Sequence, residues 1–209
     1  MLLGLFVNFS PFFCFFVLKY AYMTKNNQEL LLQNLKIKIL KDKKMPLLSS
    51  NLVFGEGSAR AKIVFIGEAP GANEDRESRP FVGRSGKLLT TCLEEIGLKR
   101  EDVYITNIVK RRPPENRDPL PEEIEAYRPY LKKQLEIIDP QIIITLGRFA
   151  LNYFISDAKI SREQGQVFKL EKSLLIPMFH PAAALRGTKV LNQFKKSFKK
   201  IARTLKLKK

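Results

Sequence analysis

An apolar run that stops at a rigid, acidic turn is the segment that most constrains the fold. Residues 63–66 read I-V-F-I, the β-branched and aromatic composition of a buried strand. Gly67, Pro70 and Gly71 follow at once and force a tight turn. The turn presents the Glu68 carboxylate, and parallel α/β sheets bind ligands beyond the carboxyl ends of their strands. We therefore expect a strand that ends at a ligand site; the plainer alternative is a surface turn with an ordinary acid.

Further apolar runs alternate with helical patterns along the chain. Besides residues 63–66, strands are expected at residues 103–106, 142–146 and 174–179. Helices are expected at residues 28–40, from a cap at Ser85 to Gly97, from Pro121 with Pro129 kinking or dividing the helix, at 147–155 and from 190 onward. This order predicts the α/β class, with a parallel sheet between two layers of helices.

The charge of the chain indicates a polyanionic partner. The 209 residues suggest a single domain, and 37 Lys and Arg against 21 Asp and Glu give a formal net charge of +16. Such an excess favours nucleic acid or an acidic membrane surface. The two cysteines, Cys14 and Cys92, are too few for a disulfide framework or a four-thiolate metal site, so we expect a cytoplasmic protein and place Cys92 in the core.

Residues 1–22 form an apolar N-terminal extension ahead of a domain at residues 23–209. The extension contains Asn8, Ser10 and Pro11, and no basic residue precedes Lys19, so it fits neither a membrane span nor a secretory signal well. It could be a weak anchor, a disordered arm, or sequence upstream of a true start at Met23, which we favour. Membrane contact is expected only if residues 1–22 are translated and inserted.

Three distinctive polar residues follow or end predicted strands. They are Glu68, Asn107 and His180, and a parallel sheet would bring them to one edge. The amide of Asn107 offers a donor and an acceptor, which suits the edge of a nucleobase. His180 could donate to an oxygen that gains negative charge. Taken singly, Asn107 could be a loop cap and His180 a turn residue; together they indicate a site.

Short motifs carry a resemblance to a known family. In chain order they are V-F-G-E-G at 53–57, G-E-A-P-G at 67–71, E-D at 74–75, P-F-V-G at 80–83, I-T-N at 105–107 and H-P-A at 180–182. In order and spacing they resemble the motifs of uracil-DNA glycosylases, most of all the bacterial and archaeal family-4 type. The resemblance runs from Val53 to the C-terminus. It implies an α/β/α sandwich of three layers with a four-stranded parallel sheet.

The resemblance implies that the chain hydrolyses the N-glycosidic bond of uracil in DNA and leaves an abasic site. The target nucleotide must leave the duplex, because the bond is otherwise out of reach. Glu68 would position the attacking water and offset positive charge on the sugar. His180 would donate to uracil O2 and stabilise the departing base.

The resemblance also assigns the walls of a uracil pocket. Phe81 would stack on the flipped base, and Asn107 would read its N3 and O4 edge. Glu74 would stand near C5 and exclude the methyl group of thymine, a task for which Gly71 has no side chain; Ala69 and Gly71 complete the pocket. The alternatives are that Phe81 belongs only to the core and that Glu74 only caps the next turn.

Contacts with the DNA backbone and base stack are implied next to these motifs. Leu185 would fill the gap left by the flipped nucleotide, Arg186 would approach phosphate, and Arg112 would add a further DNA contact. The basic C-terminal helix offers lysines for phosphate contact, although they could equally be a solvated face.

The chain departs from the family where the family usually carries an iron–sulfur cluster. The positions of the four cluster cysteines hold Leu40, Lys43, Arg111 and Tyr127. A cluster of this kind needs thiolate ligands, so we expect no cluster and no metal, with Leu40 and Tyr127 packed in its place and Lys43 or Arg111 facing DNA.

Two classes of function remain at this point. The first is an enzyme, expected to be a monomer, that excises uracil. The second is a degenerate DNA-binding protein of the same fold, possibly tethered to a membrane. The retention of Glu68 and His180 argues against degeneracy.

Overall fold

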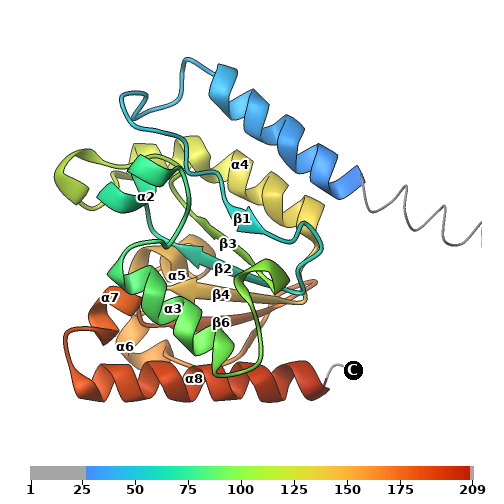
Figure 1. Cartoon of the computed structure of the whole chain (residues 1–209), viewed down its shortest axis with the longest axis vertical. Helices are drawn as coiled ribbons and strands as arrows, with labels where there is room; N and C mark the ends of the chain where they lie inside the picture. The colour runs from blue at the N-terminus through green and yellow to red at the C-terminus, as the bar shows by residue number, and fades with distance from the viewer. Residues whose placement is uncertain (1–26, 208–209) are drawn as a thin grey trace, which may run out of the picture.

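Four parallel strands form the centre of a six-stranded sheet in the computed structural model, which describes residues 27–207 (Figure 1). They are β2 (Ile63–Gly67), β3 (Tyr104–Asn107), β4 (Ile142–Leu146) and β6 (Leu174–Met178). Two short strands, β1 (Glu56–Gly57) and β5 (Phe168–Lys169), add antiparallel edges, and the order is β1-β3-β2-β4-β6-β5. The predicted parallel sheet is confirmed. The edge strands were not predicted, because two residues are too few to show a strand pattern.

The register of the parallel strands brings their carboxyl ends together. Gly67 at the end of β2 pairs with Asn107 at the end of β3, and Thr145 near the end of β4 pairs with Ile66. The strand order changes direction between β2 and β4, because β3 follows β2 on one side and β4 is added on the other. Such a switch point leaves a crevice at the carboxyl edge of the sheet.

One face of the sheet is covered by α4 (Pro121–Ile138), α5 (Arg148–Phe154) and the helix of residues 27–41, which lies beside α4 (Figure 1). Val64 and Ile66 of β2 point to this face and share a core cluster with Ile39 and Tyr127. Because side chains alternate along β2, its other residues point to the opposite face and to a separate core.

The other face is covered by α3 (Arg84–Glu94), α7 (Pro181–Ala184) and α8 (Thr188–Leu207) (Figure 1). Phe65 of β2 stacks on Phe198 of α8 with ring centroids 5.9 Å apart. Cys92 of α3 is buried in the same cluster and has a free thiol, as predicted. Helices on both faces confirm the three-layer sandwich. The remaining short elements are α2 (Ala72–Glu77), η1 (Arg100–Asp102), η2 (Pro114–Asn116) and α6 (Ile160–Glu163).

Two predicted helix details are wrong. Gly83, and not Ser85, is the N-cap of α3. Gly97 does terminate this helix: its φ of 77° is left-handed, and the next residue, Leu98, donates from its backbone N–H back to the carbonyl oxygen of Leu93 at 3.0 Å. Pro129 does not divide α4, which is one helix of 18 residues. A proline removes a single backbone donor, and Tyr127 and Leu131, buried on either side of it, anchor the helix.

The N-terminal extension of residues 1–22 lies outside the described residues. Within residues 27–207, no helix combines the length and the apolar character that a membrane crossing requires.

Candidate active site

The crevice at the carboxyl edge of the sheet holds a pocket of about 380 Å³. The three residues predicted to meet there do so: Glu68 follows β2, Asn107 ends β3 and His180 follows β6. The other predicted residues that line the pocket are Ala69, Gly71, Glu74, Phe81 and Arg186. Side chains separated by more than a hundred residues in sequence therefore share one cavity.

Gly67 leaves the space in which two of these side chains meet. A Cβ atom at this position would lie 2.4 Å from Oδ1 of Asn107 and 2.5 Å from Cζ of Phe81. Both side chains thus pack directly on the last residue of β2.

The amide of Asn107 is almost fully buried, with 1% of the residue exposed. Its Oδ1 has no hydrogen-bond partner among the described residues. The backbone of Asn107 is fixed separately, because the buried Lys110 donates from Nζ to its carbonyl oxygen at 2.7 Å. An acceptor that is buried and unpaired is costly, and a donor on a bound ligand would satisfy it.

Phe81 is both a core residue and a wall of the pocket. Phe81 is 6% exposed and belongs to the same core cluster as Leu89. The centroid of its ring lies 5.8 Å from that of the His180 ring. Its backbone φ of 53° is left-handed, a conformation that is rare for a bulky residue.

Glu74 caps a turn as well as lining the pocket. Its Oε1 accepts hydrogen bonds from the backbone N–H groups of Val82 at 2.9 Å and Gly83 at 2.8 Å. A Cβ atom on Gly71 would lie 2.9 Å from the other carboxylate oxygen of Glu74. The capping alternative considered from the sequence is therefore real, and it does not remove Glu74 from the pocket.

His180 is held as a neutral imidazole with a defined tautomer. It is the N-cap of α7, and its Nδ1 accepts a hydrogen bond from the backbone N–H of Ala182 at 3.2 Å. Burial lowers the pKa of His180 to about 4, although Glu74 acts in the opposite direction. A neutral ring whose Nδ1 accepts carries its proton on Nε2. Nε2 is therefore the donor that His180 can offer to the pocket.

The carboxyl group of Glu68 has a pKa close to neutral pH. Burial and, to a smaller extent, charge repulsion by Asp118 raise its pKa to about 7, although Arg148 acts in the opposite direction. Arg148 and Asp118 form an ion pair with each other. A carboxylic acid with a pKa near 7 in a cleft is typical of a general base or a charge stabiliser.

Of the three residues predicted to contact DNA, one lines the pocket. Arg186 lines it, and the neighbouring Leu185 is 43% exposed at the C-cap of α7. Arg112 does not line the pocket, but its Nε donates to Oδ1 of Asn116, a lining residue, at 2.8 Å.

One wall of the pocket was missed at the sequence level. It comes from the loop after β3, through Pro113, Asn116 and Arg117. Arg117 is fixed by an ion pair with the buried Glu123, with a shortest distance of 2.6 Å. The signal was available, because a proline-rich loop follows the carboxyl end of a strand that carries a site residue. Ser85 and Ala182 were also missed as lining residues.

The positions at which the family holds its cluster do not fit an iron–sulfur group. Arg111 is buried and donates to the carbonyl oxygen of Ser50, and Tyr127 is fully buried and donates to the carbonyl oxygen of Pro46 at 2.9 Å. Neither is a thiolate, which such a cluster requires. Among the described residues there is no group of three or more His, Cys, Asp or Glu that could hold a metal ion.

Of the two other cluster positions, neither packs into the core. Leu40 is 52% exposed, so the expectation that it fills the cluster position is wrong; its place on the outer side of the helix of residues 27–41 turns it to solvent. Lys43 is also exposed. Arg111 is buried and hydrogen-bonded to Ser50, so of the two residues expected to face DNA only Lys43 has an exposed side chain.

The sequence matches known proteins over the same elements that build the pocket. The family model of the uracil DNA glycosylase superfamily matches residues 54–206. The chain is 48% identical over 161 residues to the Type-4 uracil-DNA glycosylase of Archaeoglobus fulgidus, covering 73% of this chain and 81% of that protein. It is 45% identical over 182 residues to the Type-4 enzyme of Sulfurisphaera tokodaii, covering 81% and 83%, and 48% identical over 165 residues to that of Saccharolobus solfataricus, covering 74% and 76%. The chain belongs to the uracil-DNA glycosylase superfamily, in its type-4 branch.

Proposed function

We propose that this protein is a uracil-DNA glycosylase, which hydrolyses the N-glycosidic bond between uracil and deoxyribose and leaves an abasic site in DNA. The observation that carries the proposal is the meeting of Glu68, Asn107 and His180 in one pocket of about 380 Å³, in a chain that belongs to this superfamily. The high identity to Type-4 enzymes supports the enzyme over a DNA-binding protein without activity.

Asn107 and Phe81 would recognise the flipped uracil. The unpaired Oδ1 of Asn107 suits the N3–H donor of uracil, and the amide nitrogen suits O4. Phe81 would stack on the base from its position beside Asn107. Recognition by a buried group that needs a partner is selective, because a base without the matching donor leaves the amide unpaired.

His180 would stabilise the departing base. As the glycosidic bond breaks, uracil leaves as an anion and negative charge grows on O2. The Nε2–H of a neutral His180 donates a hydrogen bond to that oxygen, and the Nδ1 contact with Ala182 fixes the ring for it. Because the pKa of His180 is low, the ring stays neutral and does not transfer its proton.

Glu68 would act on the sugar and the attacking water. The sugar gains oxocarbenium character as the base leaves, and a carboxylate nearby offsets that positive charge and orients the water that adds to C1′. This role needs the ionised form of Glu68. A pKa near 7 makes the ionised fraction depend on pH in the physiological range.

Glu74, with Ala69 and Gly71, would shape the pocket against thymine. Glu74 lines the pocket next to both residues, and its carboxylate is held in place by Val82 and Gly83. A fixed side chain near C5 of the base leaves no room for a methyl group.

DNA would be bound across the pocket mouth. We assign Leu185, exposed and apolar, to the gap left in the base stack, Arg186 to phosphate, and Arg112 to a second backbone contact. The net charge of +16 supports binding to a polyanion with marked salt dependence.

We further propose that the protein works without an iron–sulfur cluster, as a monomer in the cytoplasm. The support is that Arg111 and Tyr127 stand where thiolates would be needed and that one chain supplies the whole pocket lining. Purified protein is expected to be colourless with no bound iron and to elute as a 24.1 kDa species. Visible absorbance with stoichiometric iron would overturn the first expectation, and a larger species the second.

The activity itself is tested with a labelled oligonucleotide that contains one uracil. After incubation with the protein and treatment with alkali, we expect cleavage at the uracil and none in a matched oligonucleotide with thymine. Binding of both oligonucleotides without cleavage of either would favour the degenerate DNA-binding protein.

A further inference from the structure

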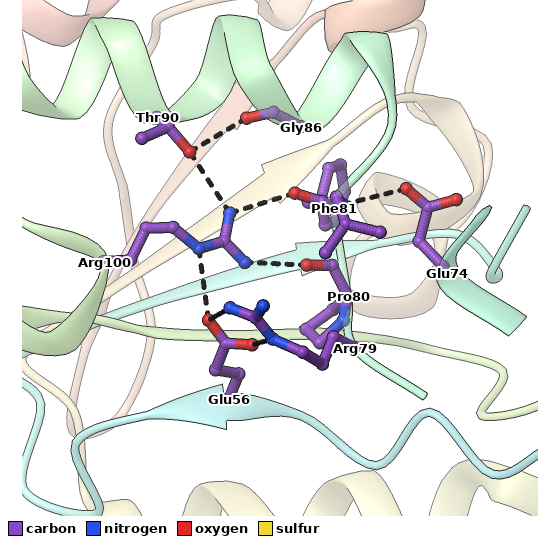
Figure 2. Close-up of polar contacts among 9 residues, drawn as sticks. Glu56, Glu74, Arg79, Pro80, Phe81, Gly86, Thr90 and Arg100 are labelled. Atoms are coloured by element: carbon purple, nitrogen blue, oxygen red, sulfur yellow. Dashed lines mark hydrogen bonds and ion pairs between the residues drawn. The ribbon is translucent and has the colours of Figure 1, made fainter. Parts of the chain in front are cut away.

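One arginine, Arg100, forms hydrogen bonds with the backbone of the turn that carries Phe81, the proposed stacking residue (Figure 2). The guanidinium of Arg100 donates from Nη2 to the carbonyl oxygen of Pro80 at 2.7 Å and from Nη1 to that of Phe81 at 3.0 Å. Nη1 also lies 3.3 Å from Oγ1 of Thr90, and Nε donates to Glu56 at 3.2 Å. Arg100 therefore bonds two consecutive peptide carbonyls from behind the pocket wall.

The Pro80–Phe81 peptide bound by Arg100 leads into a backbone conformation that other residues must stabilise. Phe81 is buried with a φ of 53°, which a large side chain adopts only when its surroundings enforce it. On the far side of the turn, Glu74 accepts from the N–H groups of Val82 and Gly83. Arg100 thus binds the carbonyl groups of this turn, and Glu74 binds its backbone N–H groups.

Helix α3 packs closely against the same turn. A Cβ atom on Gly86 would lie 1.8 Å from the carbonyl oxygen of Phe81, so the helix touches the group that Arg100 binds. Thr90, one turn later, donates to the carbonyl oxygen of Gly86 at 3.1 Å and also contacts Arg100. The turn therefore lies in direct contact with α3 and with the guanidinium of Arg100.

Arg100 is itself anchored. Its side chain is 18% exposed, and its partner Glu56 on β1 also pairs with Arg79 at 2.6 Å. Burial alone would raise the pKa of Glu56, but Arg79 and Arg100 lower it, so the carboxylate stays charged. Arg100 lies in η1, directly before β3, the strand that ends at Asn107. One residue thus links the turn that carries Phe81 to the strand that carries Asn107.

We propose that Arg100 is a positioning residue for base excision, which holds the Pro80–Phe81 peptide so that the Phe81 ring stands at stacking distance from the flipped uracil. This inference rests on the proposed function. Arg100 does not line the pocket and acts only through Phe81. An error of about 1 Å in the position of a site group can cost about 100-fold in rate, and without Arg100 the Phe81 backbone loses the two carbonyl contacts that help to hold its left-handed conformation.

The test is single-turnover release of uracil by Arg100→Met, Phe81→Ala and the double variant. Arg100→Met should lose about 10- to 100-fold in rate. In the Phe81→Ala background the same change should cost less than about threefold, because the group through which Arg100 acts is gone. Arg100→Lys, which cannot span two carbonyls and a carboxylate, should recover only part of the rate.

Arg79→Met is the matched control. It removes an arginine from the same carboxylate, Glu56, without touching either carbonyl of the Pro80–Phe81 peptide, and should leave uracil release unchanged. Equal losses from Arg79→Met and Arg100→Met, or a full loss from Arg100→Met in the Phe81→Ala background, would show a general structural role and overturn the inference.

Two further points keep the outcome clear. If Arg100→Met does not fold, as judged by circular dichroism, Arg100→Lys and Glu56→Gln decide the question by the same comparison in the Phe81→Ala background. If the wild-type protein releases no uracil, the proposed function has failed; if the wild-type protein is active and a folded Arg100→Met variant is equally active, only the inference about Arg100 has failed.

Discussion

Gly67 lies so close to Asn107 that a Cβ atom added to the glycine would stand 2.4 Å from Oδ1 of the amide. Phe81 approaches the same point, with Cζ 2.5 Å from that Cβ. The end of strand β2 therefore fixes the Asn107 amide and the Phe81 ring against one another. The first glycine of the G-E-A-P-G motif has a steric role distinct from its part in the turn.

Substitution of Gly67 by alanine should impair uracil release without preventing folding. The methyl group must displace either the Asn107 amide or the Phe81 ring, and we expect a loss of about 100-fold in single-turnover rate. Gly187→Ala is the control, because a Cβ there meets nothing within 4 Å and the residue is outside the pocket lining. Wild-type activity of folded Gly67→Ala would show that the contact is unimportant.

The rate of uracil release should rise with pH through about 7. Burial raises the pKa of Glu68 to about 7, the active form is the carboxylate, and protonation below that value removes it. His180, with a pKa of about 4, stays neutral throughout pH 5.5–8.5, so it adds no second ionisation to the pH dependence of the rate. Single-turnover rates measured across this range should fit one ionisation. Glu68→Gln should be slow at every pH, and a wild-type rate that does not change with pH would contradict the role of Glu68.

The same carboxyl group should destabilise the folded protein at high pH. Its pKa is raised above the usual 4.5, so the native state binds the proton more tightly than the unfolded state, and stability falls as pH rises from about 4.5 to 7. Glu68→Gln removes this penalty and should be more stable than the wild type at pH 8, on the order of 1 kcal/mol, because the side chain is only partly buried. At pH 4 the two proteins should unfold alike in urea. Equal stability at both pH values would mean that Glu68 has an ordinary pKa.

Asn107→Asp should extend activity to cytosine. Asn107 is 1% exposed, and burial at such a site favours the protonated acid. A carboxylic acid can donate its O–H to cytosine N3 and accept from the amino group at C4, the reverse of the pattern that uracil needs. Release of free cytosine from a cytosine-containing strand, measured by mass spectrometry, should appear while uracil release falls. If cytosine release does not appear, Asn107 is not the reader of the base edge.

Much of the fold follows from the sequence because the strands β2, β3 and β4 are buried along their whole length. The runs at residues 63–66 and 142–144 are continuous stretches of apolar side chains, and the β-α alternation leaves few topologies. The errors are local. Gly83 caps α3 in place of Ser85, and α2 (Ala72–Glu77) was not predicted because it buries no residue and so shows no apolar stripe.

The site was accessible from the sequence for a related reason. Glu68, Asn107 and His180 each stand at a strand end, and parallel strands place those ends together. Arg100 and Arg117 were not found, because their partners depend on how loops fold back. Arg100 reaches Phe81 across 19 residues and Glu56 across 44, and no local pattern announces such contacts.

The central claim, that this pocket excises uracil from DNA, is tested most directly by detecting the released base. Wild-type protein is mixed in excess with a uracil-containing oligonucleotide, and free uracil and the abasic strand are measured together by mass spectrometry. We predict one uracil and one abasic site per strand, no release from a thymine strand, and a loss of about 100-fold or more in His180→Ala. Intact uracil-containing DNA, bound by the folded protein but never cleaved at the glycosidic bond, would contradict the account.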